Sequence, residues 1–228
     1  MTAPACAAAQ FGGFSLGGYI GGVQSSSSVS DIDDWNAGAT YDHEITGFAS
    51  GVQIAYDIAR CNTLIGFVAD ATFLNADKSG IYDEDDEYKS SIEWMSTVRL
   101  RAGVALDNLY LYATGGIAFA DFNNRMRDTF EVDATEQYPS WKGDSSRIGW
   151  TVGAGLEYAL SSRLTLMTEV LYADFGSNDA TGYYREFDDG GNIENEVAYR
   201  ARFSDEVVVA KIGLSYRFRP HVHMEPMK

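Results

Sequence analysis

The sequence has little proline, cysteine or histidine: four prolines, two cysteines and three histidines in 228 residues. No stretch approaches 18 uninterrupted apolar residues, so we expect no transmembrane helix. Cys6 and Cys61 lack the CxxC spacing of zinc sites and thioredoxin-type motifs. Basic residues are also scarce, since 17 Lys and Arg against 33 Asp and Glu leave a net charge of −16. Nucleic-acid phosphates would be repelled by such a surface, so we expect no nucleic-acid partner.

Glycine and aromatic residues are abundant instead. The chain has 23 glycines, 14 tyrosines and 12 phenylalanines, a composition typical of strands joined by turns. Its length suits one domain. The hydrophobic content of 45% and the mean hydropathy of −0.21 are ordinary. They still allow a membrane β-barrel, because a spanning strand needs only about 9–11 residues and shows lipid every second side chain.

Eight segments alternate between apolar and polar residues with the period of a strand. They cover residues 11–24, 44–58, 62–74, 91–106, 109–122, 147–160, 163–176 and 205–218. Three of the links between them are short, namely 59–61, 107–108 and 161–162. The four others are long, namely 25–43, 75–90, 123–146 and 177–204. Strict alternation of short and long links predicts an all-β, eight-stranded antiparallel up-and-down transmembrane barrel, with three short periplasmic turns and four long extracellular loops.

The last segment shows the two faces most clearly. One face carries Val208, Ala210, Ile212, Leu214, Tyr216 and Phe218, and the other carries Val209, Lys211, Gly213, Ser215 and Arg217. A soluble β-sandwich would show the same alternation with the apolar face inside, so the pattern alone leaves both folds open. Aromatic residues near the segment ends favour the membrane, where they form interface girdles. These are Phe14, Tyr56, Trp94, Phe119, Tyr158, Tyr172 and Phe218.

Acidic residues gather in the long links and their shoulders. Residues 25–44, 75–93, 121–147 and 174–206 hold 27 of the 33 acidic residues and only 9 of the 17 basic ones. These regions carry a net charge of −18, and the rest of the chain carries +2. The sequence therefore predicts an acidic outer rim over a nearly neutral barrel.

Four stretches resemble a known family: GGFSLGGYIGG, ALDNLYLYATGGIAFADF, GWTVGAGLEYALSSRLTLMTEVLYADFG and KIGLSYRF. They are similar to the opacity-like and OmpA-like small outer-membrane barrels of alphaproteobacteria, often described as porin-family proteins. The resemblance covers about residues 11–218. It implies a structural membrane protein, an adhesin or a surface antigen, in contact with outer-membrane lipid and lipopolysaccharide. Such chains usually end on an aromatic residue read by the barrel-assembly machinery; Phe218 fits that role, although ten residues follow it.

Charged residues on the polar faces form the first candidate site. We expect these residues to face the lumen. They are Asp70, Glu157, Glu169, Arg99, Arg101, Lys211 and Arg217. One interpretation is a narrow ion path, and the other is a buried network that fills the barrel. The network is favoured because about eight strands leave room only for side chains.

Acidic runs in the long links form a second candidate. Their carboxylates suit Ca²⁺ or Mg²⁺, although no run matches an EF-hand loop and a solvated face is the usual role of a charge run. Loose divalent bridging to lipopolysaccharide phosphates is the alternative to a tight site. The residues are Asp31, Asp33, Asp34, Asp83, Asp85, Asp86, Asp188 and Asp189.

The two ends of the chain carry the remaining candidates. We expect residues 1–10 to be a flexible N-terminal segment or a signal-peptide remnant, and residues 219–228 to be a periplasmic tail. His221 and His223 with nearby methionines suit copper or nickel, but two histidines on a disordered tail are usually inert. Cys6 and Cys61 would share the oxidising side, so a disulfide is an open alternative.

The sequence predicts no enzyme and no cofactor. The one histidine outside the tail is His43, and no GxSxG motif is present. We therefore expect a non-catalytic outer-membrane barrel that contributes to envelope structure and presents acidic loops. A surface adhesin, or recognition module for an external protein or cell-surface ligand, is the first alternative, and a small diffusion pore is the second. Loop aromatics suit such contacts: Tyr138, Trp141, Tyr183, Tyr184 and Phe187.

Overall fold

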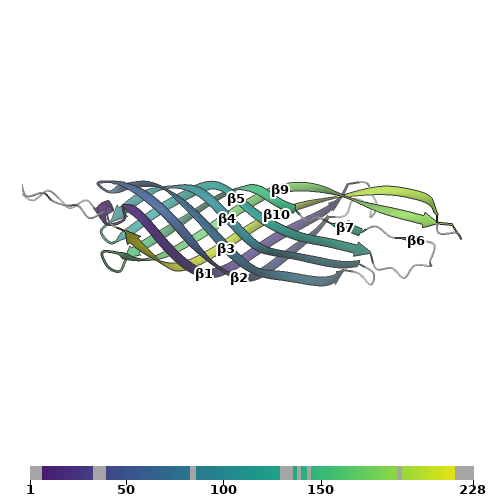
Figure 1. Ribbon diagram of the computed structural model, residues 1–228, viewed down its shortest axis with the longest axis horizontal. Helices are drawn as coiled ribbons and strands as arrows, with labels where there is room; N and C mark the ends of the chain where they lie inside the picture. Colours follow the sequence, from purple (N-terminus) through teal and green to yellow (C-terminus); the bar gives the residue numbers. More distant parts are fainter. Residues whose placement is uncertain are drawn as a thin grey trace, which may run out of the picture.

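The computed structural model describes residues 7–32, 40–82, 86–128, 136–137, 140–142, 145–188 and 192–218. Within these ranges eight long antiparallel strands wind around a common axis (Figure 1). They are β1 (Gly13–Asp31), β2 (Thr40–Arg60), β3 (Thr63–Tyr82), β4 (Asp86–Leu106), β5 (Leu109–Asp128), β8 (Ser145–Ala159), β9 (Leu164–Phe187) and β10 (Ile193–Phe218). Two short strands, β6 (Glu136–Gln137) and β7 (Ser140–Lys142), pair with β9 and β5. None of the helical segments described here is long and apolar enough to cross a membrane.

The sheet closes on itself between its first and last strands. Each long strand pairs with the next along the chain, and β10 also pairs with β1 from Phe14↔Phe218 to Asp31↔Ala201. Closure leaves no sheet edge within the barrel wall, which a membrane requires because lipid cannot satisfy backbone groups. The predicted eight-stranded antiparallel barrel is confirmed.

The three short links lie together at one end of the barrel, here called the short-turn end. Two of them are two-residue turns, in which Cys61 and Asp107 have positive φ angles of 51° and 49°. The third spans residues 160–163 between β8 and β9. Positive φ is the conformation that tight hairpin turns need, so the first two short links form such turns. The third, predicted at 161–162, is a longer connection of four residues.

The long links differ from their predicted boundaries. Much of the sequence expected as loop is strand, since β1 runs to Asp31, β3 runs to Tyr82 and β10 begins at Ile193. Asp31 and Asp86, expected in loops, are terminal residues of β1 and β4. The alternation of apolar and polar residues weakens where both faces meet water, but backbone pairing continues wherever a neighbouring strand is present. The sequence signal therefore ended before the strands did.

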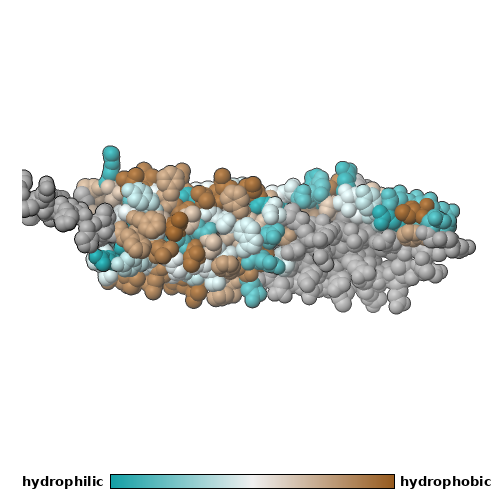
Figure 2. Space-filling model, viewed as in Figure 1, coloured by the Kyte–Doolittle hydropathy of each residue, from teal (hydrophilic) through white to brown (hydrophobic). Residues whose placement is uncertain are grey.

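The outer wall near the short-turn end is apolar, as the brown belt in Figure 2 shows. Ile65, Phe67 and Phe73 on β3 are 58%, 62% and 66% exposed. Phe14 and Phe218 are also exposed there, and their ring centroids lie 5.6 Å apart. Charged side chains are buried inside instead. This arrangement excludes the soluble β-sandwich, whose apolar faces would be turned inward.

The N-terminal segment closes the short-turn end of the lumen. A 3₁₀ turn, η1 (Ala7–Gln10), precedes β1, and Ala8 and Phe11 are fully buried. The Ala8 N–H donates a hydrogen bond of 2.9 Å to the Cys61 carbonyl. The Phe11 ring lies 5.6 Å from that of Tyr110. The expectation that residues up to 10 stay outside the fold is therefore wrong for residues 7–10, because this turn is hydrogen-bonded to Cys61 and places Ala8 in the buried mouth of the barrel. Residues 1–6, with Cys6, lie outside the described ranges.

A β-bulge marks the point where β9 and β10 continue beyond the wall as a projecting hairpin (Figure 1). Phe175 and Gly176 of β9 together face the single residue Asp205 of β10. Gly176 has a φ of +65°, and its N–H donates a 2.7 Å hydrogen bond to Asp174. Bulges bend a strand and increase its twist, so this one sets the direction of the hairpin.

Candidate functional site: the filled lumen

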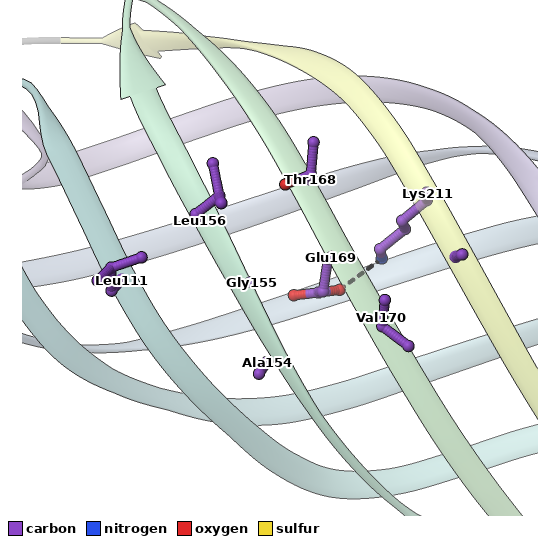
Figure 3. A pocket seen from close by; sticks show the side chains of 9 residues that line it. Leu111, Ala154, Gly155, Leu156, Thr168, Glu169, Val170 and Lys211 are labelled. Carbon is purple, nitrogen blue, oxygen red and sulfur yellow. Dashed lines mark ion pairs between the residues drawn. The ribbon is translucent and has the colours of Figure 1, made fainter.

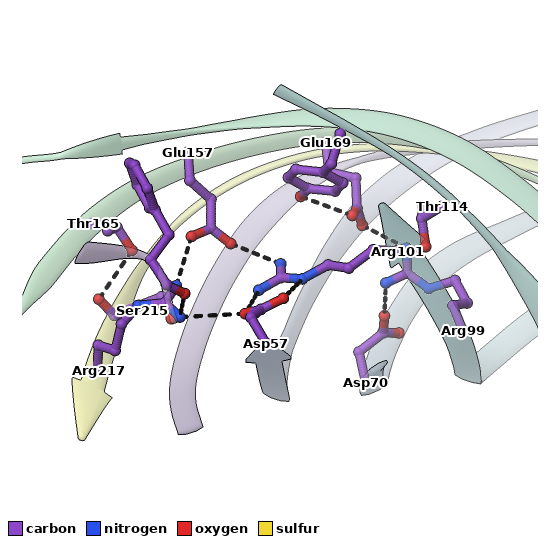
Figure 4. Close-up of polar contacts among 12 residues, drawn as sticks. Asp57, Asp70, Arg99, Arg101, Thr114, Glu157, Thr165, Glu169, Ser215 and Arg217 are labelled. Atoms are coloured by element: carbon purple, nitrogen blue, oxygen red, sulfur yellow. Dashed lines mark hydrogen bonds and ion pairs between the residues drawn. The ribbon is translucent and has the colours of Figure 1, made fainter. Parts of the chain in front are cut away.

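Four charged side chains near the short-turn end form a first neutral group, here called quartet one: Asp57, Arg101, Glu157 and Arg217 (Figure 4). Arg101 lies 2.5 Å from Asp57 and 2.7 Å from Glu157. Arg217 lies 3.2 Å and 3.0 Å from the same two carboxylates. Each arginine therefore contacts both acids. All four side chains are buried, with no more than 1% of their surface exposed.

A second neutral group, quartet two, lies further along the lumen and contains Asp70, Arg99, Glu169 and Lys211. Arg99 forms ion pairs with Asp70 and, at 2.9 Å, with Glu169. Lys211 lies 2.8 Å from Glu169 and 3.3 Å from Asp70. Thr97 also donates a 2.9 Å hydrogen bond to Asp70. As in quartet one, two cations and two anions balance.

Three tyrosines pack around these ions. Tyr112 donates a 2.9 Å hydrogen bond to Glu169, and its ring centroid lies 5.2 Å from the Arg101 guanidinium. Tyr110 lies 5.7 Å from the same guanidinium. On β1, the Tyr19 ring is 4.3 Å from the Lys211 ammonium. Tyr19 adds β1 to the network, and Tyr110 and Tyr112 add β5. All eight long strands therefore contribute a side chain.

Buried charges carry a large desolvation cost unless they are paired and hydrogen-bonded. Here each quartet has two positive and two negative side chains, so its net charge is zero. The partners come from distant parts of the chain, since Lys211 and Asp70 are 141 positions apart. Removing one member leaves an uncompensated charge, which is far more costly than the pair itself. The network therefore helps to specify which strands lie opposite one another across the lumen.

The inward residues of β10 show what lies beyond the network. Moving away from the short-turn end, Lys211 is followed by Val209 and Val207, then Asp205, then Phe203, and all are buried. The two valines belong to an apolar layer that crosses the lumen and contains Val23, Ile45, Ala49, Leu74, Ile92, Met95, Ala118, Ala120, Phe122, Ala173, Phe175, Val207 and Val209. The lumen is thus filled in layers: an apolar cap, the ions, and a second apolar layer.

Another polar contact lies beyond that layer. Arg147 pairs with Asp205 at 2.5 Å, and Ser27 donates a 2.6 Å hydrogen bond to Asp205. The Arg147 guanidinium lies 5.6 Å from the Phe122 ring. A smaller apolar cluster of Val29, Ala201 and Phe203 follows toward the far end of the strands.

The seven charged residues that the sequence suggested for the lumen all lie in the two quartets. Asp57 was missed because it stands at the end of its expected segment, although its phase matches the buried positions Gln53 and Ala55. The Arg147–Asp205 pair was missed because both residues fell at predicted strand ends. Asp57 already lies within the expected segment 44–58, so following the period-two phase from Gln53 and Ala55 would have found it.

The other candidate residues are not brought into one site. The exposed Asp188 carboxylate accepts hydrogen bonds of 2.8 and 3.0 Å from Asn192 at the tip of the β9–β10 hairpin. Among the described residues, no group of three or more His, Cys, Asp or Glu side chains could hold a metal ion. Cys61 is an exposed free thiol. The remaining predicted site residues lie outside the described ranges: Asp33, Asp34, Asp83, Asp85, Asp189, Tyr138, His221 and His223.

Two other predictions concern aromatic residues, namely Phe218 as the assembly signal and the loop aromatics as a contact surface. Phe218 ends β10 on the lipid-facing side, with its ring 5.0 Å from that of Tyr216. On the projecting hairpin, Tyr183 is 43% exposed, and the Arg185 guanidinium lies 5.3 Å from its ring. Tyr184 and Phe187 are half-buried.

A closed antiparallel barrel with an apolar outer wall and a paired ionic interior defines an integral membrane β-barrel of the outer-membrane class. The chain belongs to the outer membrane protein beta-barrel domain family, whose model matches residues 1–218. It resides in the bacterial outer membrane. Barrels of this class place short turns in the periplasm, and by that rule we expect the short-turn end to be periplasmic and the β9–β10 hairpin to be external.

Several characterised proteins are similar to this chain. The 31 kDa outer-membrane immunogenic protein of Brucella melitensis is 28% identical over 209 residues, which cover 88% of this chain and 80% of that protein. The 22 kDa outer membrane protein of Rhizobium leguminosarum is 25% identical over 183 residues, which cover 78% of this chain and 71% of that protein. The solved structure of the outer membrane protein OprG from Pseudomonas aeruginosa has a TM-score of 0.49 at 15% identity, covering 92% of this chain and 99% of that one.

Proposed function

We propose that this protein is a non-catalytic, non-conducting barrel that contributes to the structure of the outer membrane and presents acidic surface loops. The observation that supports this function most directly is the filling of the lumen. An ion would have to cross the apolar layer that contains Ile45, Phe122 and Val209. Apolar constrictions stop ions by excluding water, and eight strands leave little room around side chains.

The two ionic quartets would also block the passage of ions, because their charges are already paired. Each of the four cations already contacts two carboxylates. An ion passing through would have to replace these ion pairs, which hold the strands together. The pore alternative therefore requires both layers to rearrange.

Single-channel conductance in a planar bilayer tests this function. The barrel is first refolded in detergent, and folding is checked by the change in gel mobility between unboiled and boiled samples. We expect no discrete openings from the folded protein under conditions in which a general porin conducts. Stable openings of uniform size would reject the non-conducting barrel and establish the pore.

A second candidate function is recognition at the cell surface, and the projecting hairpin favours it. β9 and β10 pair beyond the bulge from Ser177↔Ser204 to Ile193↔Phe187. Ion pairs brace this part, with Arg185–Glu196 at 2.5 Å and Arg202–Asp179 at 2.7 Å. A braced hairpin that carries an exposed tyrosine suits a contact surface.

Removing the hairpin tests recognition separately from structure. Because Ser177 and Ser204 face each other, residues 178–203 can be replaced by Asn-Gly, which favours a tight hairpin turn. A recognition protein would lose binding to host cells or matrix proteins while keeping its gel mobility. Unchanged binding by a folded variant would reject the hairpin as the contact surface.

The proposed partners within the envelope follow from the two ends of the barrel. Phe218 at the end of β10 is the proposed signal for the barrel-assembly machinery. The acidic external residues are proposed to bridge to lipopolysaccharide phosphates through divalent cations. Phe218→Ala should slow assembly in cells, and chelation of divalent cations should weaken lipopolysaccharide retention; normal outcomes in both tests would reject these contacts.

A further inference from the structure

The lipid-facing wall has an apolar groove across β5, β8, β9 and β10, with a volume of about 460 Å³ (Figure 3). Leu111, Leu156 and Val170 form its raised parts, and all three are exposed on the outer wall. Ala154 on β8 and Ala210 on β10 are the register partners of Val170, and their side chains are small. The groove is therefore a hollow in the same apolar belt that contacts lipid.

Two charged residues also line the groove, but they do not make it polar. Glu169 and Lys211 belong to quartet two, and their charged ends meet at 2.8 Å inside the barrel. The neighbouring Thr168 side chain, on the outer face, is half-buried. Only a ligand that is largely apolar fits the outward-facing lining.

The groove lies near the middle of the membrane. Val170 is seven residues from Arg163, at the periplasmic end of the β8–β9 hairpin. At about 3.3 Å per residue and a strand tilt of about 35–45°, this separation is about 16–19 Å along the membrane normal. Thr168 is about 5 Å nearer the periplasm by the same reasoning. A lipid whose headgroup lies near Arg163 could therefore extend a chain into the groove.

We propose that the groove holds one acyl chain of a phospholipid from the periplasmic leaflet, with the lipid phosphate beside Arg163. The groove is continuous with the established lipid interface, and a void there would forfeit van der Waals contacts that a chain can supply. Arg163 is exposed, and its guanidinium lies 3.3 Å from the Tyr216 hydroxyl. Guanidinium groups bind phosphate well.

Native mass spectrometry with added phosphatidylglycerol tests the groove. We expect the wild-type barrel to retain one lipid after the detergent is removed. Ala154→Leu should fill the groove and weaken retention at least tenfold. Ala71→Leu is the matched control, because Ala71 is exposed on the outer wall of β3 and does not line the groove. Gel mobility confirms folding, and Ala210→Leu replaces Ala154→Leu if that variant does not fold.

A second pair of variants tests the headgroup contact. Arg163→Gln should weaken phosphatidylglycerol retention severalfold, whereas Arg60→Gln, at another exposed periplasmic position, should not. Equal retention by the Leu variants would overturn the groove site. Retention of lipid A in preference to phosphatidylglycerol, or a dimer in place of the lipid adduct, would overturn the assignment of the occupant.

Discussion

Tyr112 donates its hydroxyl hydrogen to Glu169 over 2.9 Å, and this contact joins the two ionic quartets. Glu169 belongs to quartet two, whereas the Tyr112 ring packs against Arg101 of quartet one. The tyrosine therefore lies between two neutral groups that otherwise pair internally. Its position makes it a sensitive probe of how the layers of the lumen are coupled.

Tyr112→Phe should lower the free energy of unfolding by about 1.5–3 kcal/mol, since a hydrogen bond to a charged group is lost while the ring remains. The measurement is urea unfolding in lipid vesicles followed by gel mobility. Tyr158→Phe is the control, because Tyr158 is 45% exposed on the outer wall. Equal midpoints for both variants would contradict the bridging role of Tyr112.

Arg101→Met should lower the free energy of unfolding by about 3–5 kcal/mol, because Asp57 and Glu157 would keep only Arg217 as a cation. Adding Glu157→Gln should recover part of the loss by removing one uncompensated charge. The same vesicle assay measures both variants. If the double variant were as unstable as the sum of the single variants, the quartet would not act as a balanced unit.

Phe122→Ala should lower the free energy of unfolding by about 3–5 kcal/mol, because it opens a cavity in the apolar layer. Phe122 is 2% exposed, and its ring lies 5.1 Å from that of Phe175. Phe73→Ala on the lipid-facing wall removes the same side chain without opening an internal cavity. Comparable losses from both variants would show that the internal layer is not tightly packed.

Phe11→Ala tests whether the N-terminal segment belongs to the fold. Phe11 is fully buried against Tyr110, so we expect a loss of about 3–5 kcal/mol in the free energy of unfolding. Phe14→Ala, exposed to lipid, serves as the control. The segment should also become accessible to added protease in the Phe11 variant; continued protection with unchanged stability would contradict the cap.

The external hairpin offers a prediction about pH. A hydrogen bond from Arg202 lowers the pKa of Asp179 below its ordinary value. The stabilising pair is therefore complete above the ordinary aspartate pKa and is lost as pH falls through the lowered one. Arg202→Gln should return the Asp179 pKa to the ordinary range in an NMR titration of the carboxyl carbon, whereas an unchanged pKa would exclude Arg202 as the cause.

The wall of the barrel could be predicted from sequence because each spanning strand has its own local signal. Lipid on one side and a polar lumen on the other impose alternation on every segment, as Ile212 and Lys211 on β10 illustrate. Beyond the membrane this constraint disappears, so the extension of β3 to Tyr82 was invisible to the pattern. For the same reason the pattern did not predict that Asp205, beside the bulge, is a buried partner of Arg147.

The sequence by itself determined the eight spanning segments, the alternation of their links and the residues that face the lumen, because these depend on a period of two within each strand. Only the tertiary structure decided which charges meet, since Asp70 and Lys211 are brought together by closure of the sheet. It also decided that residues 7–11 cap the lumen and that small side chains on neighbouring strands leave a groove. These features depend on register between strands and on the space that a closed barrel leaves inside, which no single segment encodes.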